Sequence, residues 1–288
     1  MTQDLVIEWV DSDNTATTLS PVSEMSGIHM PPVNLVTREN PTTAGGFLES
    51  SRDEIRPIRL RWLIHGYGGN ASKVSQIDAF SKTLHHSKGV GKLRFTQDSV
   101  VREIECWYRG GLEDLKENRP DVSAASLMFT AVRPYWRAAT YTQQSFELGE
   151  SVGAFLGDPF FPLRISGGDI FANPTITNVG PVEAWPIWTI TGPGSNPTFI
   201  NQTSGLRLEI TYDLDAGEQI VIDTSEGVKT IESGMGTNLT QFLSDDSDLW
   251  PLLSGGNAVQ LQLTDAVENE SAVNVQWLTQ HLSPYDVT

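Results

Sequence analysis

The residues with the best spacing for enzyme chemistry are residues 149–153, which form the pattern Gly-x-Ser-x-Gly around Ser151. In hydrolases with a nucleophile elbow, this pattern places the serine on a tight turn between a strand and a helix. The other members of such a set are also available, namely an oxyanion loop, an acid and a base: residues 65–69 (His-Gly-Tyr-Gly-Gly), Asp223 or Asp248, and His281. This spacing permits the hypothesis of an esterase that uses Ser151.

The segments around Ser151 do not support that hypothesis. Residues 141–146 (Tyr-Thr-Gln-Gln-Ser-Phe) are too polar for the buried strand that should precede the serine. Pro159 and Pro162 interrupt the helix that should follow it. The second half of the chain also lacks the alternation of strands and helices that a hydrolase of this type requires. We therefore expect no enzyme and no catalytic residues.

Two further groups of residues could bind a metal ion. His85 and His86 are adjacent, and neighbours on a helix point in different directions, so the pair makes a poor metal site. Asp213 and Asp215 form one acidic group, and residues 245–248 (Asp-Asp-Ser-Asp) form another, which lacks the glycine and distal glutamate of a calcium loop. Aspartate is common in turns because it caps the local backbone. We expect no metal site and no cofactor.

Tryptophan supplies an alternative function. Four tryptophans lie in the second half of the chain: Trp185, Trp188, Trp250 and Trp277. An exposed tryptophan on a β-sandwich could stack on a sugar, but tryptophan in alternating strands more often packs in the core. The alternative that remains is a carbohydrate-binding sandwich module that attaches to a cell wall.

Charge is distributed unevenly along this acidic chain. The formal net charge is −17, and from residue 151 onward 3 basic residues stand against 17 acidic ones. An acidic half of this kind would repel a phosphate backbone, so we expect no direct nucleic-acid binding. The one cysteine, Cys106, lies in an apolar run and predicts a buried, inert thiol. No apolar run approaches the roughly 18 residues of a membrane span, and the first residues do not resemble a signal peptide, so we expect a soluble protein made in a cytoplasm.

The first half of the chain has mixed periodicity. Residues 56–65 alternate, with Ile58, Leu60, Trp62 and Ile64 on one face, which predicts a half-buried strand. Residues 72–86 predict a helix with Ser72 as its N-cap and an apolar stripe that includes Val74. Further strands are expected at residues 92–96, 100–107 and 125–132. Residues 34–51 are expected to form an extended loop.

The second half predicts strand after strand between residues 174 and 277, separated by Gly, Pro, Asn and Asp, which is typical of a β-sandwich. We therefore expect three parts: residues 1–136 as a β domain with one helix, residues 137–168 as an irregular connector, and residues 169–288 as the sandwich. Its expected core consists of the apolar strand positions Trp188, Leu208, Ile210, Ile220, Ile222, Leu261 and Trp277.

Several segments also carry a family resemblance by their order along the chain. They are residues 59–66 (Arg-Leu-Arg-Trp-Leu-Ile-His-Gly), 106–113 (Cys-Trp-Tyr-Arg-Gly-Gly-Leu-Glu), 127–136 (Leu-Met-Phe-Thr-Ala-Val-Arg-Pro-Tyr-Trp), 173–180 (Asn-Pro-Thr-Ile-Thr-Asn-Val-Gly), 184–194 (Ala-Trp-Pro-Ile-Trp-Thr-Ile-Thr-Gly-Pro-Gly), 216–224 (Ala-Gly-Glu-Gln-Ile-Val-Ile-Asp-Thr) and 249–257 (Leu-Trp-Pro-Leu-Leu-Ser-Gly-Gly-Asn). This succession resembles the distal tail proteins of long-tailed, siphovirus-type bacteriophages. The second-half segments are most similar to members from phages of Gram-positive, especially actinobacterial, hosts.

The resemblance implies a non-enzymatic structural protein of the virion tail tip or baseplate. It implies a mainly β fold, with an N-terminal β-barrel-like domain that carries one helix and a C-terminal galectin-like β-sandwich. The N-terminal domains would form a hexameric ring around the tail channel. The implied partners are the tail tube protein above the ring and a tail-associated hub or lysin protein below it. The tape-measure protein and receptor-binding proteins are further implied partners.

Overall fold

The computed structural model describes residues 5–19, 21–40, 42–66, 70–119, 122–147 and 170–285. Two compact units divide the chain, and we call Met1–Ala139 together with His281–Thr288 unit 1, and Thr140–Gln280 unit 2. The sequence predicted that the N-terminal β domain ends at residue 136 and that the sandwich begins at residue 169. In the structure the chain instead returns to unit 1 after unit 2, so residues 281–285 do not belong with the sandwich.

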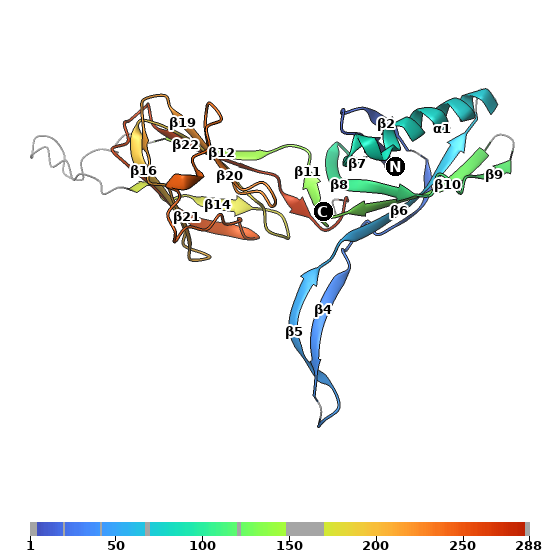
Figure 1. The fold of residues 1–288 in the computed structure, drawn as a ribbon, viewed down its shortest axis with the longest axis horizontal. Coiled ribbons are helices and arrows are strands. Elements are labelled where there is room, and N and C mark those ends of the chain that lie inside the picture. The colour runs from blue at the N-terminus through green and yellow to red at the C-terminus, as the bar shows by residue number, and fades with distance from the viewer. Residues whose placement is uncertain are drawn as a thin grey trace, which may run out of the picture. The chain divides into compact units, whose positions relative to one another are not determined.

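Unit 1 is built on one large sheet with the strand order β2-β1-β7-β8-β10-β6-β3, to which β9, β11 and β23 are added (Figure 1). The bounds of these strands, in chain order, are β1 Val6–Val10, β2 Ala16–Thr18, β3 Val22–Ser26, β6 Arg56–His65, β7 Gly91–Gln97, β8 Val100–Gly110, β9 Lys116–Arg119, β10 Val122–Ala131, β11 Trp136–Ala138 and β23 Gln280–His281. The strand order has two ends, so the described strands form an open sheet. The expected mainly β domain with one helix is confirmed, although its sheet does not close into a barrel.

Alternation along the strands produces the core of unit 1. In β6, Ile58, Leu60, Trp62 and Ile64 are buried while the residues between them face outward, as the sequence predicts. β10 pairs with β6 along its whole length, from Val122 opposite His65 to Ala131 opposite Arg56. This register lines up the apolar faces of both strands, since a slip by one residue would turn them to the other side.

The helix α1 (Asn70–Leu84) packs on this sheet through its second half. Phe80 and Leu84 are buried, and the Phe80 ring meets Trp62 edge to face at 4.7 Å. The helix begins two residues before the expected start at Ser72, and Val74 is exposed rather than part of the buried stripe. A short 3₁₀ helix, η1 (His86–Lys88), follows. Among the described residues, no helix is long and apolar enough to cross a membrane.

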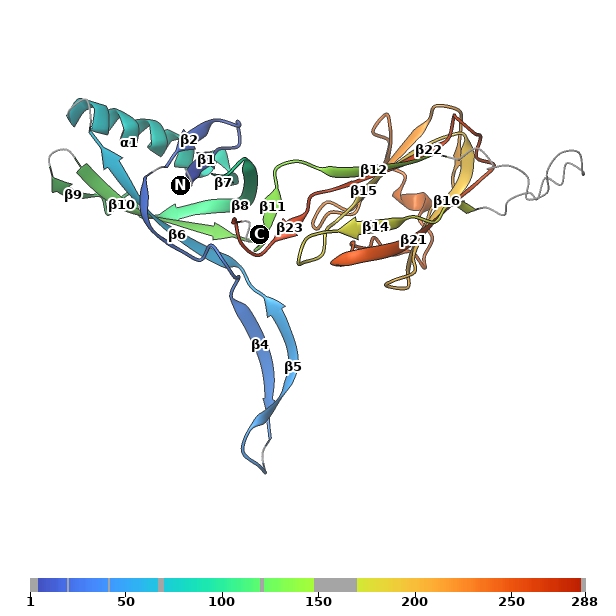
Figure 2. The same cartoon turned by 180° about the vertical axis from the view of Figure 1, so that it is seen from behind.

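Unit 2 contains two packed antiparallel sheets, which is the sandwich that the sequence predicts. The first has the order β12-β22-β15-β19-β20, and the second has the order β13-β21-β16-β17 with β14 and β18 attached (Figure 2). Their bounds, in chain order, are β12 Thr142–Glu147, β13 Ile170–Ala172, β14 Thr175–Asn178, β15 Ile187–Thr191, β16 Gly194–Asn201, β17 Leu206–Glu209, β18 Asp213–Leu214, β19 Gln219–Asp223, β20 Thr230–Ser233, β21 Gly255–Thr264 and β22 Ala272–Trp277, with the 3₁₀ helix η2 Thr240–Phe242.

The core of unit 2 contains all seven residues expected there, each at most 1% exposed: Trp188, Leu208, Ile210, Ile220, Ile222, Leu261 and Trp277. That prediction is confirmed. The expectation of an irregular connector at residues 137–168 is wrong for its described part. Arg137 and Ala138 belong to β11, and β12 pairs with β22 over six residues as an exposed edge strand.

Candidate assembly surface

The esterase hypothesis requires Ser151, the loop that begins at His65, an aspartate and His281. Those of these residues that the structure describes lie on separate elements. Ser151 itself lies outside the described residues. His65 ends β6 and His281 ends β23, both in unit 1. Asp223 ends β19 in unit 2, where its carboxylate accepts a 2.8 Å hydrogen bond from the backbone N–H of Ser225. That bond is a turn-capping contact of the kind expected for aspartate.

The metal candidates also have local structural roles. His85 precedes η1, and its Nδ1 lies 2.8 Å from the Ser87 hydroxyl. In the second acidic group, the backbone N–H of Asp248 donates to the Arg207 carbonyl at 2.7 Å. Within the described ranges, no group of three or more His, Cys, Asp or Glu residues is arranged to hold a metal ion.

The tryptophans of unit 2 offer little surface to a sugar. Trp188, Trp250 and Trp277 are buried in the core, and Trp188 stacks on Phe199 at 4.7 Å. Trp185 is half-buried, with the Lys229 ammonium 5.8 Å from the centre of its ring. The stacking platform required by the carbohydrate-binding alternative is therefore missing at three of the four expected positions.

The most exposed apolar surface of unit 1 is a hairpin made of β4 (Val33–Glu39) and β5 (Gly46–Asp53). We call it the arm. It forms a separate two-stranded sheet and extends away from the large sheet of unit 1 (Figures 1 and 2). Its exposed apolar side chains are between 45 and 64% accessible: Val33, Leu35, Val36, Phe47 and Leu48. The expectation of an extended loop at residues 34–51 is wrong.

Such a hairpin has no second layer to cover its apolar side chains. A two-stranded ribbon is at best marginally stable alone in water, and exposed apolar surface of this kind usually marks an interaction site. The arm is held at its root. The Tyr135 hydroxyl donates to the Asp53 carboxylate at 2.6 Å, and the Asn34 amide donates to Glu54 at 2.7 Å. These contacts fix the arm at its root, whereas the apolar side chains of its outer part require a partner to cover them.

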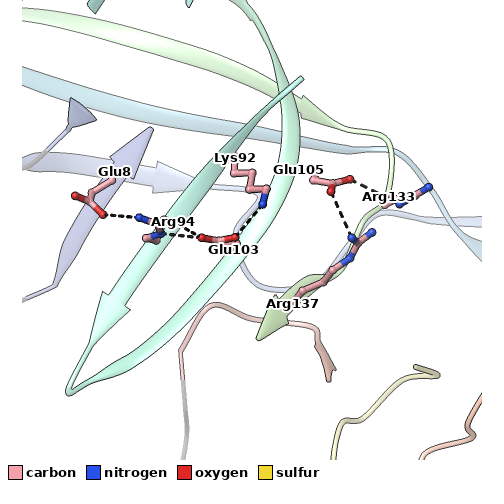
Figure 3. A network of polar contacts seen from close by, with 7 residues as sticks. All are labelled: Glu8, Lys92, Arg94, Glu103, Glu105, Arg133 and Arg137. Atoms are coloured by element: carbon pink, nitrogen blue, oxygen red, sulfur yellow. Dashed lines mark hydrogen bonds and ion pairs between the residues drawn. The ribbon is translucent and has the colours of Figure 1, made fainter. Parts of the chain in front are cut away.

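On a different surface of unit 1, charged side chains form ion pairs with one another. Figure 3 shows a network of acidic and basic side chains on the outward face of β1, β7 and β8 and on the segment after β10. Arg94 bridges Glu8 at 3.6 Å and Glu103 at 2.7 Å, and Lys92 lies 3.4 Å from Glu103. Glu105 pairs with Arg133 at 3.7 Å and with Arg137 at 3.5 Å. Because these charges are paired with one another, the network does not require opposite charges from a partner.

A family match covers much of unit 2. Residues 179–280 match the model of the siphovirus-type tail component, C-terminal domain. The second unit carries a tail component domain. A search of curated proteins gave no match. The resemblance predicted from the sequence is thus confirmed, and with it the expectation of a structural protein that resides in the tail of a virion. The actinobacterial host stays a prediction.

Solved structures extend the likeness to the whole chain. The crystal structure of Dit from phage SPP1, described as a paradigm of the hub adsorption apparatus in phages that infect Gram-positive bacteria, matches with a TM-score of 0.69 at 11% identity, covering 96% of this chain and 99% of that one. Chains of the phage P2 baseplate in its activated conformation match with TM-scores of 0.51 with calcium (10% identity, covering 96% and 98%) and 0.50 with strontium (9%, 96% and 98%). These matches show that the mainly β fold of the tail component is shared over both units.

The arm was not predicted from the sequence because its strands are exposed on both faces, so their residues do not alternate between buried and exposed positions. The signal that could have found it is a set of apolar residues on both sides of the glycine pair Gly45-Gly46: Val33, Leu35, Val36, Phe47 and Leu48.

Proposed function

We propose that this tail component is a structural protein of the tail tip, in which six copies join through unit 1 into a ring. The observation that carries the proposal is the arm, since apolar side chains on a projecting ribbon are stabilised only when another surface covers them. A second copy is the simplest partner, because every copy brings both an arm and a surface to receive it. Such head-to-tail contacts close into a ring when the rotation allows it.

Unit 1 also offers a receiving surface. Trp107 is exposed on β8, on the same face as Glu103 and Glu105, and its strand partner is Thr130. Val132, two residues after Thr130, is exposed as well. An apolar spot bordered by paired charges resembles the core and rim of a protein interface. We propose that the arm of one copy covers this spot on the next.

The proposed partners of the ring are those that the family resemblance implies. They are the tail tube protein on one side and a tail-associated hub or lysin protein on the other, with tape-measure and receptor-binding proteins nearby. The similarity to SPP1 Dit, which is described as a paradigm of the hub adsorption apparatus, supports this placement. We propose no catalytic activity, no metal and no cofactor.

The test is the association state of purified full-length protein and of a variant with Phe47→Ser and Leu48→Ser. The matched control is Met235→Ser, which removes an exposed apolar side chain from unit 2, where Met235 is 98% accessible. Sedimentation should show a large species for the wild type and the control and a smaller one for the arm variant. An arm variant that assembles like the wild type would remove the arm from the proposed interface.

A further inference from the structure

The chain end that returns from unit 2 binds beside the root of the arm. After β23, the segment Leu282, Ser283 and Tyr285 presents its carbonyl groups to two buried arginines of unit 1. Arg102 donates to the carbonyl of Ser283 at 2.8 Å and to that of Tyr285 at 2.5 Å. Hydrogen bonds from a charged donor are about twice as strong as neutral ones.

The second arginine, Arg56, joins three segments of the chain. It is the first residue of β6, which begins shortly after the arm ends at Asp53, and its side chain is completely buried. Its guanidinium donates to the carbonyls of Ile28 at 3.0 Å and His29 at 3.3 Å, in the segment between β3 and the first strand of the arm. It also donates to the carbonyl of Leu282 at 3.1 Å. The Arg56 side chain therefore connects three segments: residues 28–29 before the arm, the start of β6 after the arm, and the C-terminal segment at Leu282.

Arg56 remains a cation at neutral pH. Burial lowers the pKa of its guanidinium to about 10, while the nearby Asp53 and Tyr135 raise it. A buried charge left without its partners is strongly destabilising. Loss of the Leu282 carbonyl would leave part of this guanidinium unpaired, so the C-terminal segment and the root of the arm depend on each other.

Further contacts connect the same two segments. The His29 Nδ1 lies 3.2 Å from the Ser283 hydroxyl, and the His29 ring lies 5.5 Å from the ring of Tyr285. Trp136 donates its indole N–H to the Ile28 carbonyl at 2.9 Å. Gly27, at φ +75°, lies so close to β6 that an added Cβ would overlap the Pro57 carbonyl oxygen. The segment that leads into the arm, residues 27–29, is thus fixed from several directions.

We propose that Leu282–Tyr285 and Arg56 form a latch that sets the direction in which the arm leaves unit 1. Leu282 is two residues beyond the last residue of unit 2, so the latch makes the position of the arm depend on the chain that comes back from the sandwich. The role of the latch in assembly rests on the proposed function of the arm. Its structural role does not, because it concerns only contacts inside unit 1.

The test compares two truncated chains with the full-length protein. A chain that ends at His281 lacks the latch, whereas a chain that ends at Tyr285 keeps it and serves as the matched control. Each carries spin labels at Leu48→Cys on the arm and Val74→Cys on α1, both exposed positions, in a Cys106→Ala background that removes the one native cysteine. Electron paramagnetic resonance then measures the distance between the arm and the body of unit 1.

We expect a single narrow distance for the full chain and for the control, and the loss of that narrow distance in the chain that ends at His281. Amide exchange near residues 28–34 should become about tenfold faster in the same variant, as expected for local opening. An unchanged narrow distance would overturn the latch. If the shorter chain does not fold, Arg56→Lys in the full chain replaces it, and a narrow distance in that variant has the same meaning.

Sedimentation of the same truncated and full-length chains without the spin labels, which therefore keep Leu48, separates this inference from the proposed function. If the chain that ends at His281 loses both the narrow distance and the ability to assemble, the result supports both the latch and the assembly role of the arm. A lost distance with intact assembly supports the latch and contradicts the assembly role of the arm.

Discussion

Trp188 is the residue on which the packing of unit 2 depends most clearly. Its ring lies between Phe199, stacked at 4.7 Å, and Trp250, edge to face at 5.6 Å. Trp188→Ala should lower the free energy of unfolding by about 3–5 kcal/mol, because a buried aromatic side chain is replaced by a cavity. That loss is a large part of the 5–15 kcal/mol typical of a domain.

Urea denaturation of residues 140–280 measures this loss, with Met235→Ala as the exposed control. An unchanged midpoint for Trp188→Ala would contradict the buried placement. It would also return Trp188 to the carbohydrate-binding alternative as a possible exposed platform.

Cys106 gives a prediction about pH. Complete burial raises the pKa of its thiol far above the usual value. The folded state therefore keeps the proton while the unfolded state loses it near pH 8.5, so this group favours unfolding as the pH rises above about 8.5. A thiol reagent at pH 8 should label Cys106 only as fast as the protein unfolds. Rapid labelling of native protein, at the rate seen in urea, would show that the thiol is accessible.

Ser151 gives a prediction about activity. Since the chain shares the fold of tail components and we propose no enzyme, Ser151→Ala should leave any background hydrolysis of a p-nitrophenyl ester unchanged. Ester hydrolysis by the wild type that disappears in this variant would revive the esterase hypothesis.

The burial of a single side chain could be predicted from the sequence wherever it follows from the pattern of neighbouring residues. Ile58 and Trp62 could be assigned to the core because they alternate with polar residues. Arg56 could not be assigned to the latch, because Leu282 lies 226 positions away along the chain. No local periodicity reports a contact of that separation.

The arm is the element that most needs a partner. Replacing residues 34–52 by a short turn between Val33 and Asp53, which are opposite each other in the ribbon, should leave the melting temperature of unit 1 nearly unchanged. The reason is that the side chains removed are mostly exposed and contribute little to its core. Calorimetry measures the temperature, and a large decrease would show that the arm stabilises its own unit.

The elements that the sequence missed share one physical property. The strands of the arm are exposed on both faces, and β12 is a polar edge strand, so neither shows the alternation that a half-buried strand requires. Strand β6 was predicted because one of its faces is buried and the other is not. The exposed strands are held by backbone pairing with a neighbour, which side-chain patterns do not report.

The division of the whole molecule predicts which fragments fold. Residues 140–280 include β12 and its partner β22, whereas a fragment that begins at residue 169 leaves the edge of β22 unpaired. The longer fragment should therefore melt at a higher temperature, since β12 supplies a full ladder of hydrogen bonds and the partly buried side chain of Phe146. Equal melting temperatures would show that β12 is dispensable.

At the scale of the whole molecule, two units joined by one continuous sequence were foreseeable from the change of charge and periodicity near the middle of the chain. The return of the C-terminal segment to unit 1 was not, because residues 281–285 carry no apolar pattern that connects them to the first half. Their place is fixed by backbone carbonyls that accept bonds from Arg56 and Arg102, and backbone groups are the same in every sequence.

The proposed ring is tested most directly by counting the copies in the assembled particle. Native mass spectrometry of the full-length protein, at a concentration high enough to resemble its density in a tail, gives the mass of the assembled particle without any partner. We expect a species of six copies that is lost in the variant with Phe47→Ser and Leu48→Ser. Only monomer from the full-length protein, or an assembled species of the same mass from that variant, would contradict it.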